Sequence, residues 1–111
     1  MAFNVRGKGL VVLSSCSHSG VINVLRHVQR VTGVDHVHGF IGGLHLTGGL
    51  FESIIPNTIQ ELVALSPEVI VPGHCTGWRA THKVSQALPN VYTASNVGTT
   101  FIFAADQQPS G

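Results

Sequence analysis

Hydrophobic residues along the first half of the chain change their spacing in a regular order. Residues 9–16 (GLVVLSSC) form a short β-branched run without helical periodicity, which predicts a buried strand. After a polar break, apolar residues recur at helical spacing over 21–31, and Gly33 supplies a stop signal. Residues 35–41 (DHVHGFI) alternate apolar and polar before two glycines at 42–43, so we expect a second strand that ends in a tight turn.

The second half of the chain continues this alternation of strands and helices. A proline suits the first turn of a helix predicted over 56–65, and a third short strand is expected at 69–71. Residues 78–88 predict another short helix. Two apolar segments, 91–93 and 99–103, are predicted to be closing strands.

This order of elements indicates the fold class. Strands that alternate with helices of 10–15 residues are typical of an α/β protein. A small sheet with helices on one face leaves its other face apolar and uncovered. The composition agrees, because 43% of residues are apolar and only 10% are charged, where about a quarter is usual. We expect one domain over 1–103, packed against a second sheet, and a flexible polar tail over 104–111.

The charge pattern argues against two classes of partner. The net charge is +1 and the six lysines and arginines are scattered, so neither a nucleic-acid stripe nor a basic membrane patch is predicted. No apolar run approaches the roughly 18–20 residues that span a bilayer, and the N-terminal residues lack the apolar stretch of a secretory signal. Cys16 and Cys75 fall outside C-x-x-C spacing, so we expect reduced thiols in a cytoplasmic protein.

Three histidines follow the ends of predicted strands and lie among small residues: His18, His45 and His74. Ligands of α/β sheets gather beyond the carboxyl ends of strands, where neighbouring loops converge. Neutral imidazole is the commonest metal ligand, and small neighbours let the ring approach an ion. The three histidines are therefore candidate metal ligands. The alternative is that each is a loop histidine bonded to nearby backbone.

Other chemistry is less well supported by the sequence. His36 and His38 share a face of one predicted strand and form a weaker candidate metal pair. The paired glycines at 42–43 lack the strand–GxGxxG–helix context of a dinucleotide site. Cys75 follows His74 directly, and adjacent residues on an extended chain point to opposite faces, so a thiol–imidazole catalytic pair is not expected.

Three segments of the chain resemble a known family. GLVVLSSCSHSGVINVLRHVQRVTGVDHVHGFIGGLHL, VIVPGHCTGW and NVGTTFIF are similar to metallo-β-lactamase-fold proteins related to dihydropterin ribofuranosyl-aminobenzene phosphate synthase. Together they extend over about residues 7–103, and the Cys-Ser-His-Ser-Gly and Pro-Gly-His-Cys-Thr-Gly motifs are fairly specific to that group.

The resemblance implies an αββα sandwich with two metal ions, often zinc, at one edge of its sheets. His18 matches the third ligand of the first metal, and His74 matches the late histidine ligand of the second. His45 lies near the place where many relatives have a bridging aspartate. In such proteins a metal-bound hydroxide is the nucleophile, because the ions lower the pKa of bound water toward neutrality.

One large departure from the family limits what this chain is expected to do. The His-x-His-x-Asp-His motif that supplies most ligands is absent, and 36–41 begins like it without the Asp-His continuation. We interpret the chain as a C-terminal half domain: a natural half, an excised fragment or a degenerate relative. It is expected to pair with a second copy as a homodimer or with a missing N-terminal half, and to be a weak or inactive hydrolase alone. The alternatives are a metal-dependent hydrolase whose site is completed between chains, and a non-catalytic binding or scaffold module. The catalytic residues and the substrate are not assigned.

Overall fold

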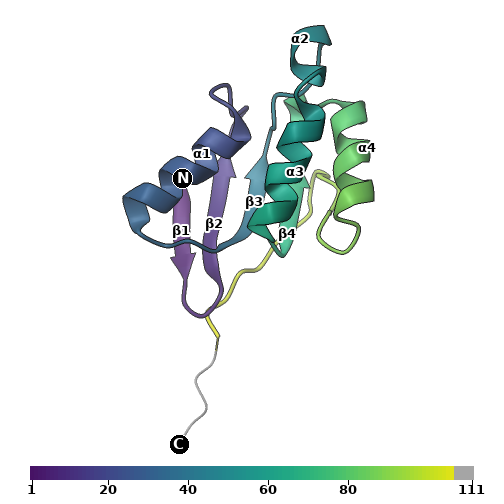
Figure 1. The fold of residues 1–111 in the computed structure, drawn as a ribbon. Helices are drawn as coiled ribbons and strands as arrows, with labels where there is room; N and C mark the ends of the chain where they lie inside the picture. Colours follow the sequence, from purple (N-terminus) through teal and green to yellow (C-terminus); the bar gives the residue numbers. More distant parts are fainter. Residues whose placement is uncertain (107–111) are drawn as a thin grey trace, which may run out of the picture.

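The computed structural model describes residues 1–106, apart from the side chain of His74. Within this part of the chain, four strands form one mixed sheet in the order β1-β2-β3-β4 (Figure 1). β1 is antiparallel to β2, whereas β2, β3 and β4 are parallel to one another. The strands are β1 (Ala2–Val5), β2 (Gly9–Ser14), β3 (Val37–Gly42) and β4 (Val69–Pro72).

The helices α1, α3 and α4 all lie on one face of this sheet (Figure 1). The strands β2, β3 and β4 follow one another in a single direction across the sheet. Because crossovers between parallel strands are right-handed, the connecting helices must then fall on the same face. The α/β class with helices on one face is therefore confirmed. The helices are α1 (Val21–Thr32), α2 (Gly49–Glu52), α3 (Ile55–Leu65), the 3₁₀ helix η1 (His74–Thr76) and α4 (Trp78–Ala87).

Local sequence signals account for the ends of these helices. Gly33 adopts a left-handed conformation with φ 71° and donates its N–H to the carbonyl of Gln29, which ends α1 as predicted. Pro56 lies in the first turn of α3, where its missing N–H has no cost. The strand β1 and the short helix α2 were not predicted.

The hydrophobic core lies between the sheet and the three long helices. Side chains on one face of each central strand pack against one stripe of each helix. Complete burial of an aliphatic or aromatic side chain contributes about 1.5–3 kcal/mol. Deeply buried members of the core include Leu10, Val12, Leu25, Phe40, Leu62, Ile70 and Val84.

The opposite face of the sheet carries apolar side chains that no helix covers. Phe3, Val11, Leu13 and Ile41 line a depression of about 610 Å³ on it. Phe3 is 52% exposed and Leu13 is 38% exposed. Among the described residues, no helix has the length and apolar character needed to cross a bilayer.

The prediction of two closing strands is wrong for the described residues. Residues 91–93 make only a single parallel bridge to β4, between Ile70 and Tyr92, and 99–103 form no strand. Phe103 instead packs against the sheet at Gly39, whose missing side chain leaves room for the ring. A segment whose side chains pack on the face of a sheet lies too far from its edge to join the hydrogen-bond ladder.

The residues beyond this segment approach the turn between β1 and β2. The N–H of Asp106 donates to the carbonyl of Arg6, and its carboxylate lies 2.7 Å from Nζ of Lys8. The prediction of a flexible tail over 104–111 otherwise falls on 107–111, which lie outside the described residues.

We predict that the uncovered face mediates association of the chain with a second copy. Replacement of Leu13 by lysine puts a charge on this face and should shift the protein toward a monomer, because a buried unpaired charge is costly. Val63→Lys, on the outer side of α3 where Val63 is 44% exposed, is the matched control and should leave association unchanged.

Sedimentation equilibrium of both variants and of the unaltered chain measures this directly. Obligate interfaces commonly bury more than about 2,000 Å², so the unaltered chain should stay associated at low micromolar concentration. A stable, folded monomer of the unaltered chain at that concentration contradicts the prediction.

Candidate functional site

The three loops that contain the predicted histidines meet at one edge of the sheet. His18 follows β2, His45 follows β3 and His74 opens η1 after β4. Parallel pairing of these strands brings their carboxyl ends to the same edge. Backbone hydrogen bonds join the loops in pairs: Gly43 N–H to the carbonyl of Ser15 at 2.7 Å, and Gly73 N–H to that of Gly42 at 2.6 Å.

Side chains tie the last loop to the other two. The hydroxyl of Thr76, which is fully buried, accepts a hydrogen bond from Leu44 N–H at 3.0 Å. The thiol of Cys75 donates to the carbonyl of Cys16 at 3.4 Å. The loops at this edge therefore form one hydrogen-bonded unit, which restricts the positions that their histidines can take.

His18 and His45 face each other at this edge. Their ring centroids are 4.5 Å apart with the planes tilted by 51°, and Phe51 packs edge-on against His45 at 4.6 Å. Nδ1 of His45 is buried and has no hydrogen-bond partner among the described residues. Because buried polar atoms are nearly always satisfied, this nitrogen is suited to a ligand that the protein itself does not supply.

The backbone around both rings is in an uncommon conformation. His45 has φ 51°, and Ser17, which precedes His18, has φ 60°. Such left-handed residues other than glycine cost of the order of 1–3 kcal/mol and concentrate at functional sites. Ser17 is held by a hydrogen bond from its hydroxyl to that of Ser14 at 2.9 Å. This hydrogen bond therefore supports the left-handed residue that precedes His18.

A pocket of about 290 Å³ opens beside the two rings, which lies near the lower limit for small-molecule sites. One wall of the pocket is apolar and comes from the loop after β3 and from α2 and α3. The other wall is the polar turn that contains His18. Its main lining residues are Ser17, His18, Ser19, Asn23, Leu44, His45, Leu46, Phe51, Ile54 and Thr58.

The predicted approach of His18 to His74 concerns a side chain that lies outside the described residues. The backbone of the loop that contains His74 lies at the same edge, through the hydrogen bonds of Gly73 and Thr76. The structure therefore brings His18 and His45 together, and the placement of the His74 ring stays a prediction.

The imidazoles of His18 and His45 could supply some, but not all, of the ligands of a metal ion. Two neighbouring imidazoles, one with a buried unsatisfied nitrogen, are suitable ligands for zinc or another divalent transition metal. A catalytic ion usually has three protein ligands, and no acidic side chain is among the described residues that line the pocket. His18 and His45 alone are therefore too few for a catalytic ion.

Most of the carboxylates of the chain are engaged elsewhere. Glu61 pairs with Arg26 at 3.1 Å, Glu52 with Arg79 at 3.5 Å, and Asp106 with Lys8 at 2.7 Å. These pairs lie on the helices and at the β1–β2 turn. They leave the edge that contains His18 without a negative charge from those residues.

The two cysteines at this edge are half-buried, Cys16 in the loop after β2 and Cys75 in η1. Neither forms a disulfide within the described residues. Burial raises the pKa of the Cys16 thiol above its ordinary value, and the hydrogen bond and charge of Cys75 act in the same direction. A thiol with a raised pKa stays protonated at neutral pH and is a poor nucleophile.

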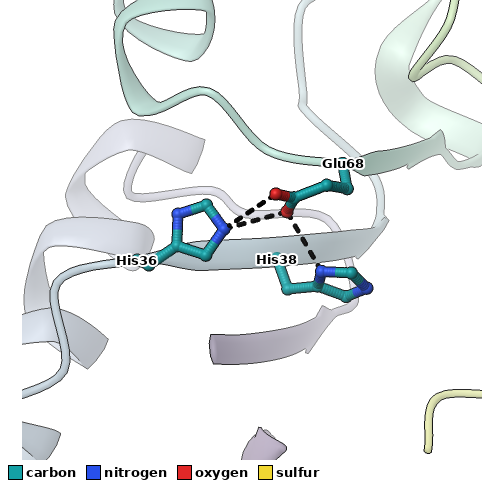
Figure 2. Close-up of side chains that lie close together, drawn as sticks. All are labelled: His36, His38 and Glu68. Atoms are coloured by element: carbon teal, nitrogen blue, oxygen red, sulfur yellow. Dashed lines mark hydrogen bonds and ion pairs between the residues drawn. The ribbon is translucent and has the colours of Figure 1, made fainter. Parts of the chain in front are cut away.

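A second cluster of donors lies at the opposite end of the strands and includes a residue that sequence reasoning missed. Figure 2 shows His36 and His38 turned toward the carboxylate of Glu68. Glu68 directly precedes β4, which pairs with β3, so its position at a strand start was the available signal.

The comparisons with known proteins agree with this architecture. Over 99 residues the chain is 31% identical to the 7,8-dihydropterin-6-methyl-4-(β-D-ribofuranosyl)-aminobenzene-5′-phosphate synthase of Methanocaldococcus jannaschii, covering 89% of the chain and 33% of the relative. It is 34% identical over 82 residues to an uncharacterised protein of the same organism, covering 74% of the chain and 30% of that relative. No family model matches the chain.

A solved structure shows the same fold. The crystal structure of a metal-dependent hydrolase of the β-lactamase superfamily superposes with a TM-score of 0.82 and 25% sequence identity, over 93% of this chain and 39% of that one. The predicted resemblance is confirmed: the chain has the architecture of part of a metallo-β-lactamase-fold hydrolase. Its sequence is similar to the dihydropterin ribofuranosyl-aminobenzene phosphate synthase group, and it spans about a third of the length of the curated relatives.

Gly43 provides a test of how tightly the loops at this edge are packed. A Cβ at this position would lie 2.4 Å from Sγ of Cys75 and 2.8 Å from the carbonyl oxygen of Ser15. Gly43→Ala should lower the free energy of unfolding by about 1–3 kcal/mol, because overpacking forces the loops apart. The measurement is urea denaturation followed by circular dichroism.

Gly49→Ala is the matched control. Its Cβ would meet no atom within 4 Å, and Gly49 begins α2. Alanine there should leave the stability unchanged or raise it by up to about 1 kcal/mol. Equal stability of the two variants would show that the loops at this edge are loosely packed.

Proposed function

We propose that this chain is the C-terminal half of a metal-dependent hydrolase of the metallo-β-lactamase fold. In this proposal His18, His45 and His74 supply metal ligands at the carboxyl edge of the sheet. The chain by itself is a weak or inactive hydrolase. Zinc is the preferred ion, because imidazole nitrogens suit it. Imidazole also suits other divalent transition metals, and coordination geometry distinguishes among them.

The observation that carries the proposal is the geometry of His45. Its ring lies 4.5 Å from that of His18, in a strained backbone conformation, with a buried nitrogen that lacks a partner among the described residues. An ordinary loop histidine bonded to nearby backbone would have satisfied that nitrogen. A metal ion satisfies it and gives the strain a function.

The ligand count supports weak activity of the chain alone. A metal ion at this edge would supply a water of lowered pKa as the nucleophile. The chain's own part is to hold the ion through its imidazoles and to form the apolar pocket wall of Leu44, Leu46 and Phe51, which limits access of bulk water. Since no carboxylate lines the pocket, a bridging ligand and a general base are both missing from its described lining.

A second candidate is a hydrolase whose site is completed between chains. The uncovered apolar face of the sheet favours it, because a second sheet packed there would produce the sandwich that the fold family requires. A copy of this chain brings further histidines, whereas an N-terminal half brings the motif that this sequence lacks. The third hypothesis is that the chain is a non-catalytic binding or scaffold module.

The proposal predicts little turnover by the chain alone. Hydrolysis of a generic phosphodiester with added zinc or manganese should be close to the uncatalysed rate, and a His18→Ala, His74→Ala double variant should differ little from the unaltered chain. His27→Ala, an exposed residue of α1, is the control for nonspecific loss of an imidazole. Robust turnover that only the double variant abolishes would overturn weak activity and favour a site completed between chains.

Zinc affinity distinguishes the hypothesis of a non-catalytic scaffold from the hypothesis of a metal-binding half of a hydrolase. Competition with a chromophoric chelator should show one zinc ion whose affinity falls at least about tenfold in His45→Ala. Loss of a residue that only orients a ligand already costs about 10–100-fold in metal affinity, and loss of a ligand should cost at least as much. Unchanged affinity of every bound zinc ion in His45→Ala would contradict a ligand role for His45 and favour the scaffold hypothesis.

A further inference from the structure

Three side chains with metal-binding donor atoms lie together at the amino-terminal ends of β3 and β4 (Figure 2). Nε2 of His36 lies 2.9 Å and 3.1 Å from the two carboxylate oxygens of Glu68. Nδ1 of His38 lies 3.0 Å from the oxygen that makes the shorter of these contacts. One donor atom from each residue falls within 4.8 Å of the other two.

The backbone holds all three residues in place. The carbonyl of His36 accepts a hydrogen bond from Leu10 N–H at 2.9 Å, and that of His38 accepts one from Glu68 N–H at 2.8 Å. The cluster is therefore built on the hydrogen-bonded starts of neighbouring strands rather than on a loose loop. Donors on such elements are held more accurately than donors on loops.

An irregularity in the sheet directs His38 toward this cluster. Leu10 pairs with Val37 and Val11 pairs with Gly39, so His38 is an extra residue on β3. Bulges of this kind redirect a side chain and are frequent at functional sites. The ring of His38 packs edge-on against Phe103 at 5.9 Å and is only 16% exposed.

A glycine on the neighbouring strand leaves the space that His36 occupies. Gly9 has φ 115°, and a Cβ there would lie 2.6 Å from the carbonyl oxygen of His36 and 2.9 Å from Cδ2 of its ring. Any larger residue at position 9 would displace the first donor of the cluster.

We propose that His36, His38 and Glu68 form a second binding site for a divalent transition metal such as zinc. Two imidazoles and one carboxylate are a donor set that zinc accepts with a fourth position open to water. Zinc ligands at about 2.0–2.2 Å in a tetrahedron lie roughly 3.4 Å from one another, so small side-chain rotations bring these donors into place. The ion would lie between the rings and the carboxylate.

This site is separate from the histidines at the carboxyl edge. β3 runs from Val37 to Gly42 between the two sites, and at about 3.3 Å per residue its length separates them by roughly 20 Å. The plain alternative is an ion-pair network without metal. Exposed ion pairs stabilise proteins little. A gain in stability therefore does not explain why three side chains held by the backbone point toward one another.

Zinc binding by three variants tests the proposal. His38→Gln and Glu68→Gln keep the size of each side chain and should each weaken one zinc site at least about tenfold, measured by competition with a chromophoric chelator. The double variant His18→Ala, His45→Ala should keep that site. This pattern supports the second site whatever happens at the carboxyl edge.

Ring signals of the histidines provide the deciding measurement in the unaltered protein. Zinc should shift the NMR resonances of the His36 and His38 rings together, with no need for any substituted chain to fold. Absence of these shifts, or equal zinc affinity in the unaltered protein, His38→Gln and Glu68→Gln, overturns the proposal. Loss of zinc binding only in the His18→Ala, His45→Ala variant overturns it too, and supports the carboxyl-edge site instead.

Discussion

Parallel pairing of β2, β3 and β4 is the constraint on which the other features depend. It requires α1 and α3 as crossovers on one face, and it collects the strand ends at one edge and the strand starts at the other. Each edge consequently gathers residues that are far apart in sequence. His18 meets His45 at one edge, and His36 and His38 meet Glu68 at the other.

The small number of acidic residues affects the carboxyl edge and the amino-terminal edge of the sheet differently. With five acidic residues in the sequence, ion pairs to Arg26, Arg79 and Lys8 engage three of the carboxylates. Glu68 lies between the histidines of the amino-terminal edge. Among the described residues, the lining of the pocket at the carboxyl edge includes imidazoles and no carboxylate. The mixed set of imidazoles and carboxylate lies at the amino-terminal edge, which the family resemblance did not indicate.

Local patterns in the sequence were sufficient for the elements that depend on local physics. The periodicity of 21–31 and the stop at Gly33 predicted α1, and the breaks after strands predicted where histidines would gather. β1 was missed because its four residues have no strong periodicity and gain order only by pairing with β2. The partnership of Glu68 with two histidines depends on strand register, and the path of 99–103 depends on the space above Gly39. Neither is encoded in a local window.

The uncovered face and the amino-terminal cluster are physically connected. Phe103 packs on Gly39 on the face that lacks helices, and the same ring contacts His38. A second sheet that covered this face would press on Phe103 and reduce the exposure of His38, which is already low. The proposed association through the open face and the proposed metal binding at the amino-terminal edge therefore involve the same two side chains, Phe103 and His38.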